Sequence, residues 1–142
     1  MAFYAKVKLD GQGSSYESQS LQGYHFDYNR KLDPFTLSAV GALEHFKITL
    51  ELFSEGGEKD RVLFRWFINN FTDLRGEITL YSGANNSSPV SKVIKLRQAK
   101  IYKLEETFNR HGTDPVMIEL GLVAVTVDYA DIEIDTTEQM QR

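Results

Sequence analysis

The sequence predicts a mainly β protein: a small β-barrel of two packed antiparallel sheets with one short flanking α-helix at residues 60–70. Residues 115–134 (PVMIELGLVAVTVDYADIEI) form an almost unbroken strand pattern, and Val93–Phe108 gives a second long one. The opening Ala2–Leu9 alternates apolar and polar residues and stops at Asp10-Gly11. Strands of this length far exceed the usual run of about five or six residues. They suit a twisted barrel or sandwich whose edges meet another subunit.

Period-two alternation predicts three strands in the first 53 residues, each with one apolar face. They are Ala2–Leu9, Gly23–Asn29 and Leu43–Phe53, and the first ends in the turn residues 10–13 (DGQG). Their expected core-facing residues are Phe3, Ala5, Val7 and Leu9, then Tyr24, Phe26 and Tyr28, then Phe46, Ile48, Leu50 and Leu52.

Arg30–Ala42 (RKLDPFTLSAVGA) does not resemble a regular element. Pro34 removes a backbone donor and disfavours helical geometry at Asp33. The segment would expose apolar side chains if it stood alone in water, and a long apolar loop is usually functional or covered. It is therefore expected to contact a neighbouring subunit or ring, through Asp33, Pro34, Phe35, Thr36 and Leu37.

The pattern changes to helical spacing at Lys59–Asn70 (KDRVLFRWFINN), where residues 63, 66, 67 and 70 share a face. Asp60 is suited to cap the start of a helix, and its charge favours the helix dipole there. The prediction is one helix over Asp60–Asn70, with Trp66 and Phe67 packed into the core rather than exposed to a ligand.

The remaining elements follow in order along the chain. Arg75–Tyr81 is expected to be a strand and Ser82–Pro89 a surface loop. The two long strands come next, separated by the turn-rich Asn109–Pro115. The final residues 135–142 are polar and expected to be a frayed tail. With 142 residues and no linker, residues 1–142 are expected to form a single domain.

Composition narrows the possible classes of protein. The chain has a net charge of −4 and shows no basic stripe, so a nucleic-acid partner is not expected. It contains no cysteine, which excludes disulfides, thiolate nucleophiles and cysteine-ligated zinc. Membrane insertion is not expected because no apolar run is long enough to span a bilayer. The N-terminus does not resemble a signal peptide, so export would need another route.

No group of residues has the pattern of a catalytic, cofactor or metal site. The three histidines lack metal-ligand spacing, and His111 lies in turn sequence. A catalytic triad would need a nucleophile, a base and an orienting acid, and no nucleophile motif accompanies His111 and Asp114. Asp131, Glu133 and Asp135 are expected to share one strand face as a solvated edge. We therefore expect a protein that is not an enzyme.

Several segments occur in an order shared with a known family. They are AFYAKVKLDG at 2–11, LFRWFIN at 63–69, GEITLY at 76–81, KVIKLRQAKIYKLEETFN at 92–109 and DPVMIELGLVAVTVDYADIEI at 114–134. This set resembles the Hcp tube proteins of bacterial type VI secretion, and most closely the Bacteroidetes version called TssD. The likeness covers most of residues 2–134.

The resemblance implies a small β-barrel whose copies form homo-hexameric rings, and rings that stack into a tube. A contractile sheath would drive this tube, tipped by a spike and built on a baseplate, into a neighbouring cell. The tube would assemble in the bacterial cytoplasm and be secreted, with effector proteins in its lumen. Relatives commonly carry a Gly-Arg-Pro turn where this chain has residues 30–38 (RKLDPFTLS), which leaves stacking geometry and partner choice open.

Three other functions fit a barrel of this kind. A phage-like contractile tail tube would share the architecture. A monomeric ligand-binding barrel would need an apolar cavity open to water, and strand alternation does not distinguish a filled interior from a hollow one. An enzyme on a β-barrel is the remaining alternative, and no catalytic group supports it.

Overall fold

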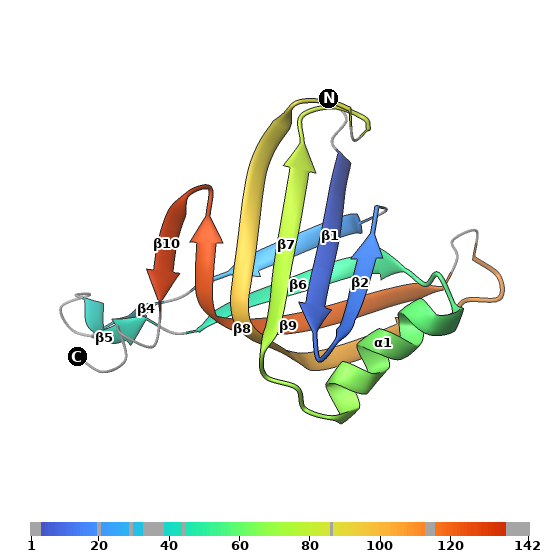
Figure 1. Ribbon diagram of the computed structural model, residues 1–142, viewed down its shortest axis with the longest axis horizontal. Coiled ribbons are helices and arrows are strands. Elements are labelled where there is room, and N and C mark those ends of the chain that lie inside the picture. Colours follow the sequence, from blue (N-terminus) through green and yellow to red (C-terminus); the bar gives the residue numbers. More distant parts are fainter. Residues whose placement is uncertain are drawn as a thin grey trace.

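One antiparallel sheet of eight strands folds back over itself in the computed structural model (Figure 1), which describes residues 4–19, 21–28, 30–32, 39–43, 45–85, 87–112 and 116–135. Its order is β2-β1-β7-β8-β9-β6-β3, with β10 paired to β9, while β4 and β5 pair separately. The strands are β1 (Tyr4–Gly11), β2 (Ser14–Ser18), β3 (Leu21–Asp27), β4 (Arg30–Leu32), β5 (Ala39–Leu43), β6 (Phe46–Phe53), β7 (Leu74–Tyr81), β8 (Val90–Thr107), β9 (Met117–Tyr129) and β10 (Ile132–Asp135), and the helix is α1 (Gly57–Ile68).

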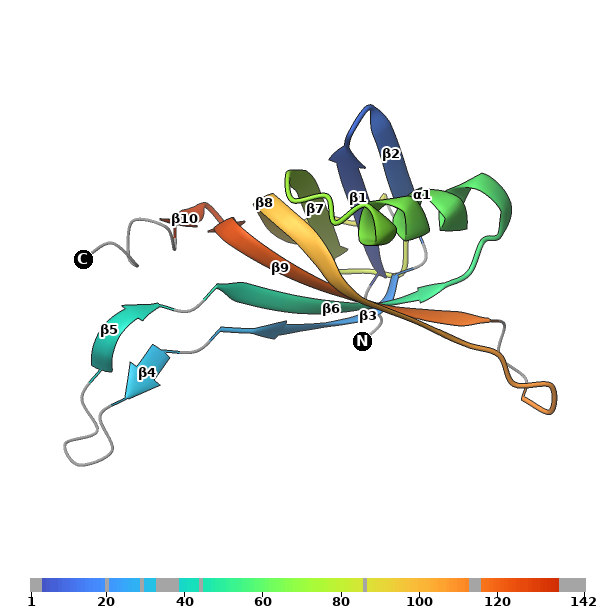
Figure 2. The same cartoon turned by 90° about the horizontal axis from the view of Figure 1, so that it is seen from below.

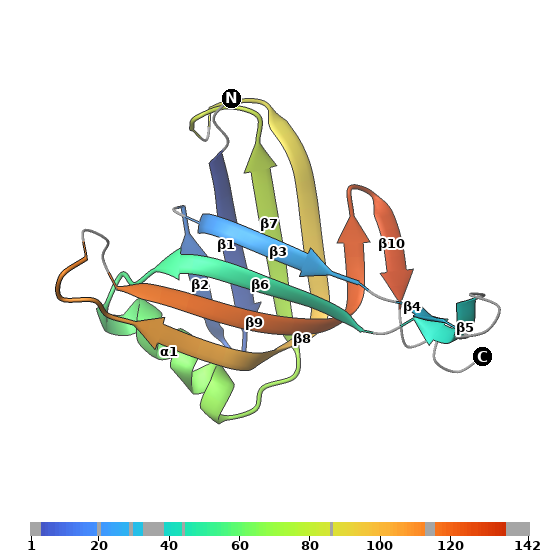
Figure 3. The ribbon, with the colours of Figure 1, turned by 180° about the vertical axis from the view of Figure 1, so that it is seen from behind.

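The long strands β8 and β9 belong to both halves of the folded sheet. The first half of β8 pairs with β7 as far as Ala99, and the end of β9 carries β10. The first layer consists of β1, β2, β7 and β10, together with the first half of β8 and the end of β9. The second half of β8 and the start of β9 continue into a second layer with β6 and β3 (Figure 3). The predicted barrel of two packed antiparallel sheets is confirmed, and its layers are two parts of one continuous sheet.

Both long strands change the phase of their side-chain alternation where they pass between the layers. On β8, Arg97 and Gln98 are both exposed between the buried Leu96 and Ala99, and Gln98 has a φ of 51°. On β9, Thr126 and Val127 are both buried. Because strand side chains otherwise alternate strictly, such irregularities let one strand face the same core before and after a corner.

The space between the layers is filled by the predicted apolar faces. Residues of β6 and β9 are among the most buried, and Trp66 of α1 is only 1% exposed. The predicted inward positions of the first and third strands that the structure describes are confirmed: Ala5, Val7, Leu9, Phe46, Ile48, Leu50 and Leu52. Phe67 packs against this core while partly exposed, so Trp66 and Phe67 both lie where we expected.

The helix begins and ends earlier than predicted, at Gly57 and Ile68 instead of 60 and 70. Its N-cap is Gly56, at a φ of 72°, so Asp60 is not the capping residue. Asp60 instead lies in the first turn and accepts hydrogen bonds from the Gly56 N–H, at 3.2 Å, and from the Ser54 hydroxyl. Its carboxylate still stabilises the N-terminus, because acidic groups there interact favourably with the helix dipole.

The strand predicted over residues 115–134 is two strands. It breaks at Ala130 and Asp131, which have φ values of 48° and 74° and connect β9 to β10 in a tight hairpin. The Asp131 N–H donates to Oδ1 of Asp128 at 3.0 Å, which supports this left-handed backbone. Asp131 therefore lies in a turn, and the prediction that it shares a strand face with residues 133 and 135 is wrong.

Short strands account for the other differences. Residues 14–18 form β2, which pairs with β1 although Tyr16 is its only large apolar residue. The segment 30–42, predicted to be irregular, contributes β4 and the larger part of β5, a pair of strands at the end of the molecule away from α1 (Figure 1). Pairing with a neighbouring strand stabilises such segments, and a neighbour is not visible in local sequence.

Tyr16 gives the fold a measurable dependence on high pH. The residue is 2% exposed, and burial, followed by the negative charge of Glu55, raises the pKa of its phenol to about 12. The folded state therefore disfavours ionisation, so stability is retained below the unfolded pKa of about 10 and lost as the pH rises towards 12. We expect a loss of about 2–3 kcal/mol over this interval, measured by urea unfolding at successive pH values. The variant Tyr16→Phe should have a flatter profile, and an equally steep one would contradict this assignment.

Candidate assembly surfaces

The second layer has one covered face and one free face. Figure 2 shows β1, β2, β7 and α1 on one side of it and none of these elements on the other. The free face carries charged and polar side chains in rows that cross the strands. One row joins Asp27, Lys47, Val123 and Lys100, and another joins Gly23, Glu51, Glu119 and Glu105. This mixture suits a wall in contact with water rather than a dry interface.

The acidic row on this face is partly neutralised by one lysine. Like charges placed directly opposite on neighbouring strands are destabilising. The Lys103 ammonium lies 3.4 Å from Glu105 and 3.5 Å from Glu119. The hydrogen bond to Glu105 and the charge of Glu119 raise the pKa of Lys103. The free face is therefore most acidic towards the end nearest α1.

A bulge next to this lysine shapes the middle of the free face. Tyr102 is the extra residue on β8, so that it and Lys103 both lie beside Gly121 of β9. A Cβ atom at Gly121 would lie 3.0 Å from Cζ of Tyr102 and 3.0 Å from Cβ of Lys103. The Tyr102 ring therefore covers the glycine, which explains why a position facing outward is buried.

The second layer ends in two free strand edges. Beyond Ala99, β8 pairs with β9 on one side, and no strand of the described chain pairs with its other side. At the opposite end of the layer, β3 pairs only with β6 within the described residues. Figure 3 shows these as the outermost strands of the layer. Unpaired edges expose backbone donors and acceptors and are ready to pair with another chain.

A groove lies between α1 and the distal part of β8, beside one of these edges. It is a cavity of about 520 Å³ lined by Leu63, Phe64, Leu104 and Ile118, with charged residues around them: Asp60, Arg61, Arg65 and Glu106. Phe64 is 54% exposed. An open apolar groove of this kind is typical of a contact surface.

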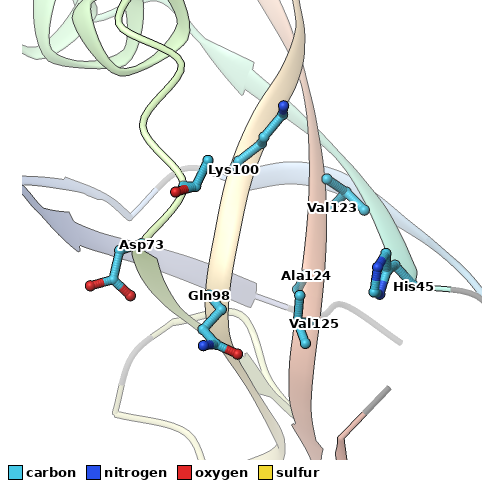
Figure 4. Close-up of a pocket in the computed structure, with 8 residues that line it drawn as sticks. His45, Asp73, Gln98, Lys100, Val123, Ala124 and Val125 are labelled. Atoms are coloured by element: carbon cyan, nitrogen blue, oxygen red, sulfur yellow. The ribbon is translucent and has the colours of Figure 1, made fainter. Parts of the chain in front are cut away.

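A larger hollow of about 680 Å³ lies outside the bend of β8 and β9. Its polar side chains are spread over several elements. Figure 4 shows His45 and Asp73 on opposite sides of the two strands, with Gln98 and Lys100 on β8 between them. The acid and the imidazole do not converge on one point, so the hollow lacks the geometry of an acid–base pair.

The described residues contain no group of three or more histidine, aspartate or glutamate side chains placed to hold a metal ion. Nor does any helix in the described ranges have the length and apolar character needed to cross a membrane.

The predicted contact residues lie outside the described residues, in the segment between β4 and β5. They are Asp33, Pro34, Phe35, Thr36 and Leu37. Their role stays a prediction. We expected sheet edges that meet another subunit, but the sequence does not say which strands supply them, because only the strand order shows that. The groove was missed, because it forms only where α1 packs beside β8.

A folded antiparallel sheet with a charged free face, two open edges and an apolar groove defines a β-barrel protein suited to self-assembly. The family model for Hemolysin coregulated protein Hcp (TssD) matches residues 1–137, so the chain belongs to this family. It is a structural protein of the type VI secretion tube, a component that this system secretes.

Solved structures share the fold at low sequence identity. Hcp1 from Flavobacterium johnsoniae has a TM-score of 0.69 and 21% identity, over 91% of this chain and 98% of that one. Hcp1 from Salmonella typhimurium has a TM-score of 0.68 and 10% identity, over 98% of both chains. The SPP1 tail tube has a TM-score of 0.63 and 14% identity, over 98% of this chain and 83% of that one. No curated protein matches the sequence.

Proposed function

We propose that this chain forms homo-hexameric rings that stack into the inner tube, and that each ring closes through the free edges of the second layer. The observation that carries this proposal is the strand order. The layer contains four strands, each antiparallel to the next, so its edge strands β3 and β8 run in opposite directions. In a rotationally symmetric ring, β3 of one copy therefore meets β8 of the next in the antiparallel sense.

This contact pairs the free backbone donors and acceptors of both edge strands at once. It is heterologous, because the two surfaces that meet are different, and such contacts close into rings when the rotation returns to its start. The described edges are similar in length, seven residues in β3 and eight in Lys100–Thr107 of β8. Joined in this way, the second layers form a continuous barrel whose free faces line the lumen.

The remaining parts of the proposal follow from this arrangement. A lumen lined by rows of mixed charge stays wet and holds effector proteins weakly. The sheath, spike and baseplate contact the tube from outside or at its ends, and sheath contraction supplies the energy. The protein itself is not catalytic, and the tube assembles in the cytoplasm before it is expelled. The fold shared with an anti-feeding prophage baseplate structure, at a TM-score of 0.51, is compatible with a baseplate partner.

Negative-stain electron microscopy of the purified chain, with light scattering on the same sample, tests this function. We expect six-fold rings with an open centre and a scattering mass of about six copies. A monomer at every concentration would contradict the proposal, and a ligand-binding barrel would then become the hypothesis to test.

A further inference from the structure

The interior side of β3, together with Tyr28 directly after it, carries aromatic side chains that are less buried than their neighbours. Tyr24, Phe26 and Tyr28, here called the aromatic row, pack against the core but remain partly exposed. On the adjacent β6, Ile48 and Leu50 are 1% and 0% exposed. The difference follows from position, because β3 is an edge strand and β6 an internal one.

The aromatic row is held in place by the barrel itself. The rings of Tyr28 and Phe46 stack with centroids 3.8 Å apart, and Phe26 lies 5.3 Å from Phe46 and 5.8 Å from Tyr129. Side chains fixed in this way lose little conformational entropy when a partner covers them, which favours binding. Tyrosine and phenylalanine are also enriched in the cores of protein interfaces.

The opposite edge of the layer has a matching groove. Leu104 is on the interior side of β8 and partly exposed, and it forms the groove with Ile118 of β9 and with Leu63 and Phe64 of α1. The apolar lining would accept aromatic rings. The guanidinium groups of Arg61 and Arg65 and the Glu106 carboxylate, which also line the groove, can bond to tyrosine hydroxyls.

Pairing of β3 with β8 brings these two features together. Side chains alternate between the faces of a strand, so a register that keeps interior residues inside shifts only in steps of two. Three such registers place a residue of the aromatic row opposite Leu104: Tyr24, Phe26 or Tyr28. We propose that the aromatic row of one copy fills the groove between α1 and β8 of the next copy. This proposal rests on ring closure through the two edges and adds the apolar contact that stabilises it.

A charge placed in the groove tests the contact directly. Phe64 is exposed in the single chain, so Phe64→Asp should leave the barrel folded, as judged by circular dichroism, and abolish the rings seen by electron microscopy. Ile68→Asp is the matched control, because Ile68 is on the same helix, 63% exposed and not part of the groove lining. We expect this control to keep its rings. Rings that persist in Phe64→Asp, or that are lost in both variants, would overturn the assignment.

Engineered disulfides give a second measurement that does not disturb the core. The chain has no cysteine, so each introduced pair can be read without background. His25→Cys is combined in turn with Lys103→Cys, Glu105→Cys or Thr107→Cys, all exposed positions on the free face. Antiparallel neighbours lie within disulfide range.

One of these three pairs should give a ladder of covalent multimers after mild oxidation, and it identifies the register. Single-cysteine variants, which cannot extend beyond a dimer, are the controls. Intact rings without a ladder from any pair would overturn the contact between the aromatic row and the groove, because these three pairs cover the registers that set the row opposite Leu104. A wild-type chain that forms no rings would instead contradict the proposed function, so the two failures are distinguishable.

Discussion

Replacement of Trp66 by alanine should destabilise the folded chain by about 3–5 kcal/mol, the cost typical of truncating a large buried aromatic residue. Trp66 is 1% exposed and is the largest of the fully buried side chains in the described core. The indole packs α1 onto the barrel core. Where the chain leaves the helix, the backbone N–H of Phe71 donates a hydrogen bond to the backbone carbonyl of Trp66 at 3.1 Å. The cavity left by the indole would therefore loosen the only described helix, and urea unfolding monitored by circular dichroism measures the change.

Ile68→Ala is the control for this prediction. Ile68 is on the same helix and 63% exposed, so its truncation should change stability by less than about 0.5 kcal/mol. All variants should be compared at one protein concentration, because assembly stabilises the folded state by mass action. Equal losses for the two variants would show that the helix contributes through its backbone alone and would refute the core role of the indole.

Truncation of Leu120 to alanine should cost about 2–5 kcal/mol. Leu120 of β9 lies between Leu50 of β6 and Leu104 of β8 in register, and both it and Leu50 are 0% exposed. The surrounding strands are held by ladders on both sides of β9, so they cannot collapse into the space that the side chain leaves. Urea unfolding measures the loss, with the slope of the transition compared between variants to detect a change in the unfolded state.

Leu120→Met tests whether the loss of stability comes from the cavity or from any change of residue at this position. Methionine has a similar volume and a flexible side chain, and such exchanges usually cost less than about 1.5 kcal/mol. We therefore expect Leu120→Met to retain most of the stability that Leu120→Ala loses. If the two variants were equally unstable, shape at this position would matter more than volume.

Much of the fold was predictable because side-chain alternation is a local property. The inward positions of β1 and β6 were correct residue by residue, from Ala5 to Leu9 and from Phe46 to Leu52. The helix was found because its apolar residues follow helical spacing over about three turns of sequence, although its start was misplaced. Asp60 has the side chain of a capping residue, yet the chain uses Gly56, whose φ of 72° suits glycine.

The predictions failed where a neighbour decides the structure. β2 has few apolar residues and exists because β1 pairs with it, and the run 115–134 divides at Ala130 and Asp131 because β10 turns back onto β9. The predicted contact residues 33–37 stay a prediction, as does the single domain over 1–142. The groove beside Leu104 had no sequence signal, since helix and strand meet there only after folding.

By itself, the sequence determined which side chains face the core, that the protein is mainly β with a short helix, and the resemblance to the tube family. These properties depend on periodicity and residue type, which are local. Only the tertiary structure decided where β8 and β9 bend, which edges stay free and where α1 leaves a groove. Those features depend on which strands become neighbours, and long-range packing of the whole chain selects the neighbours.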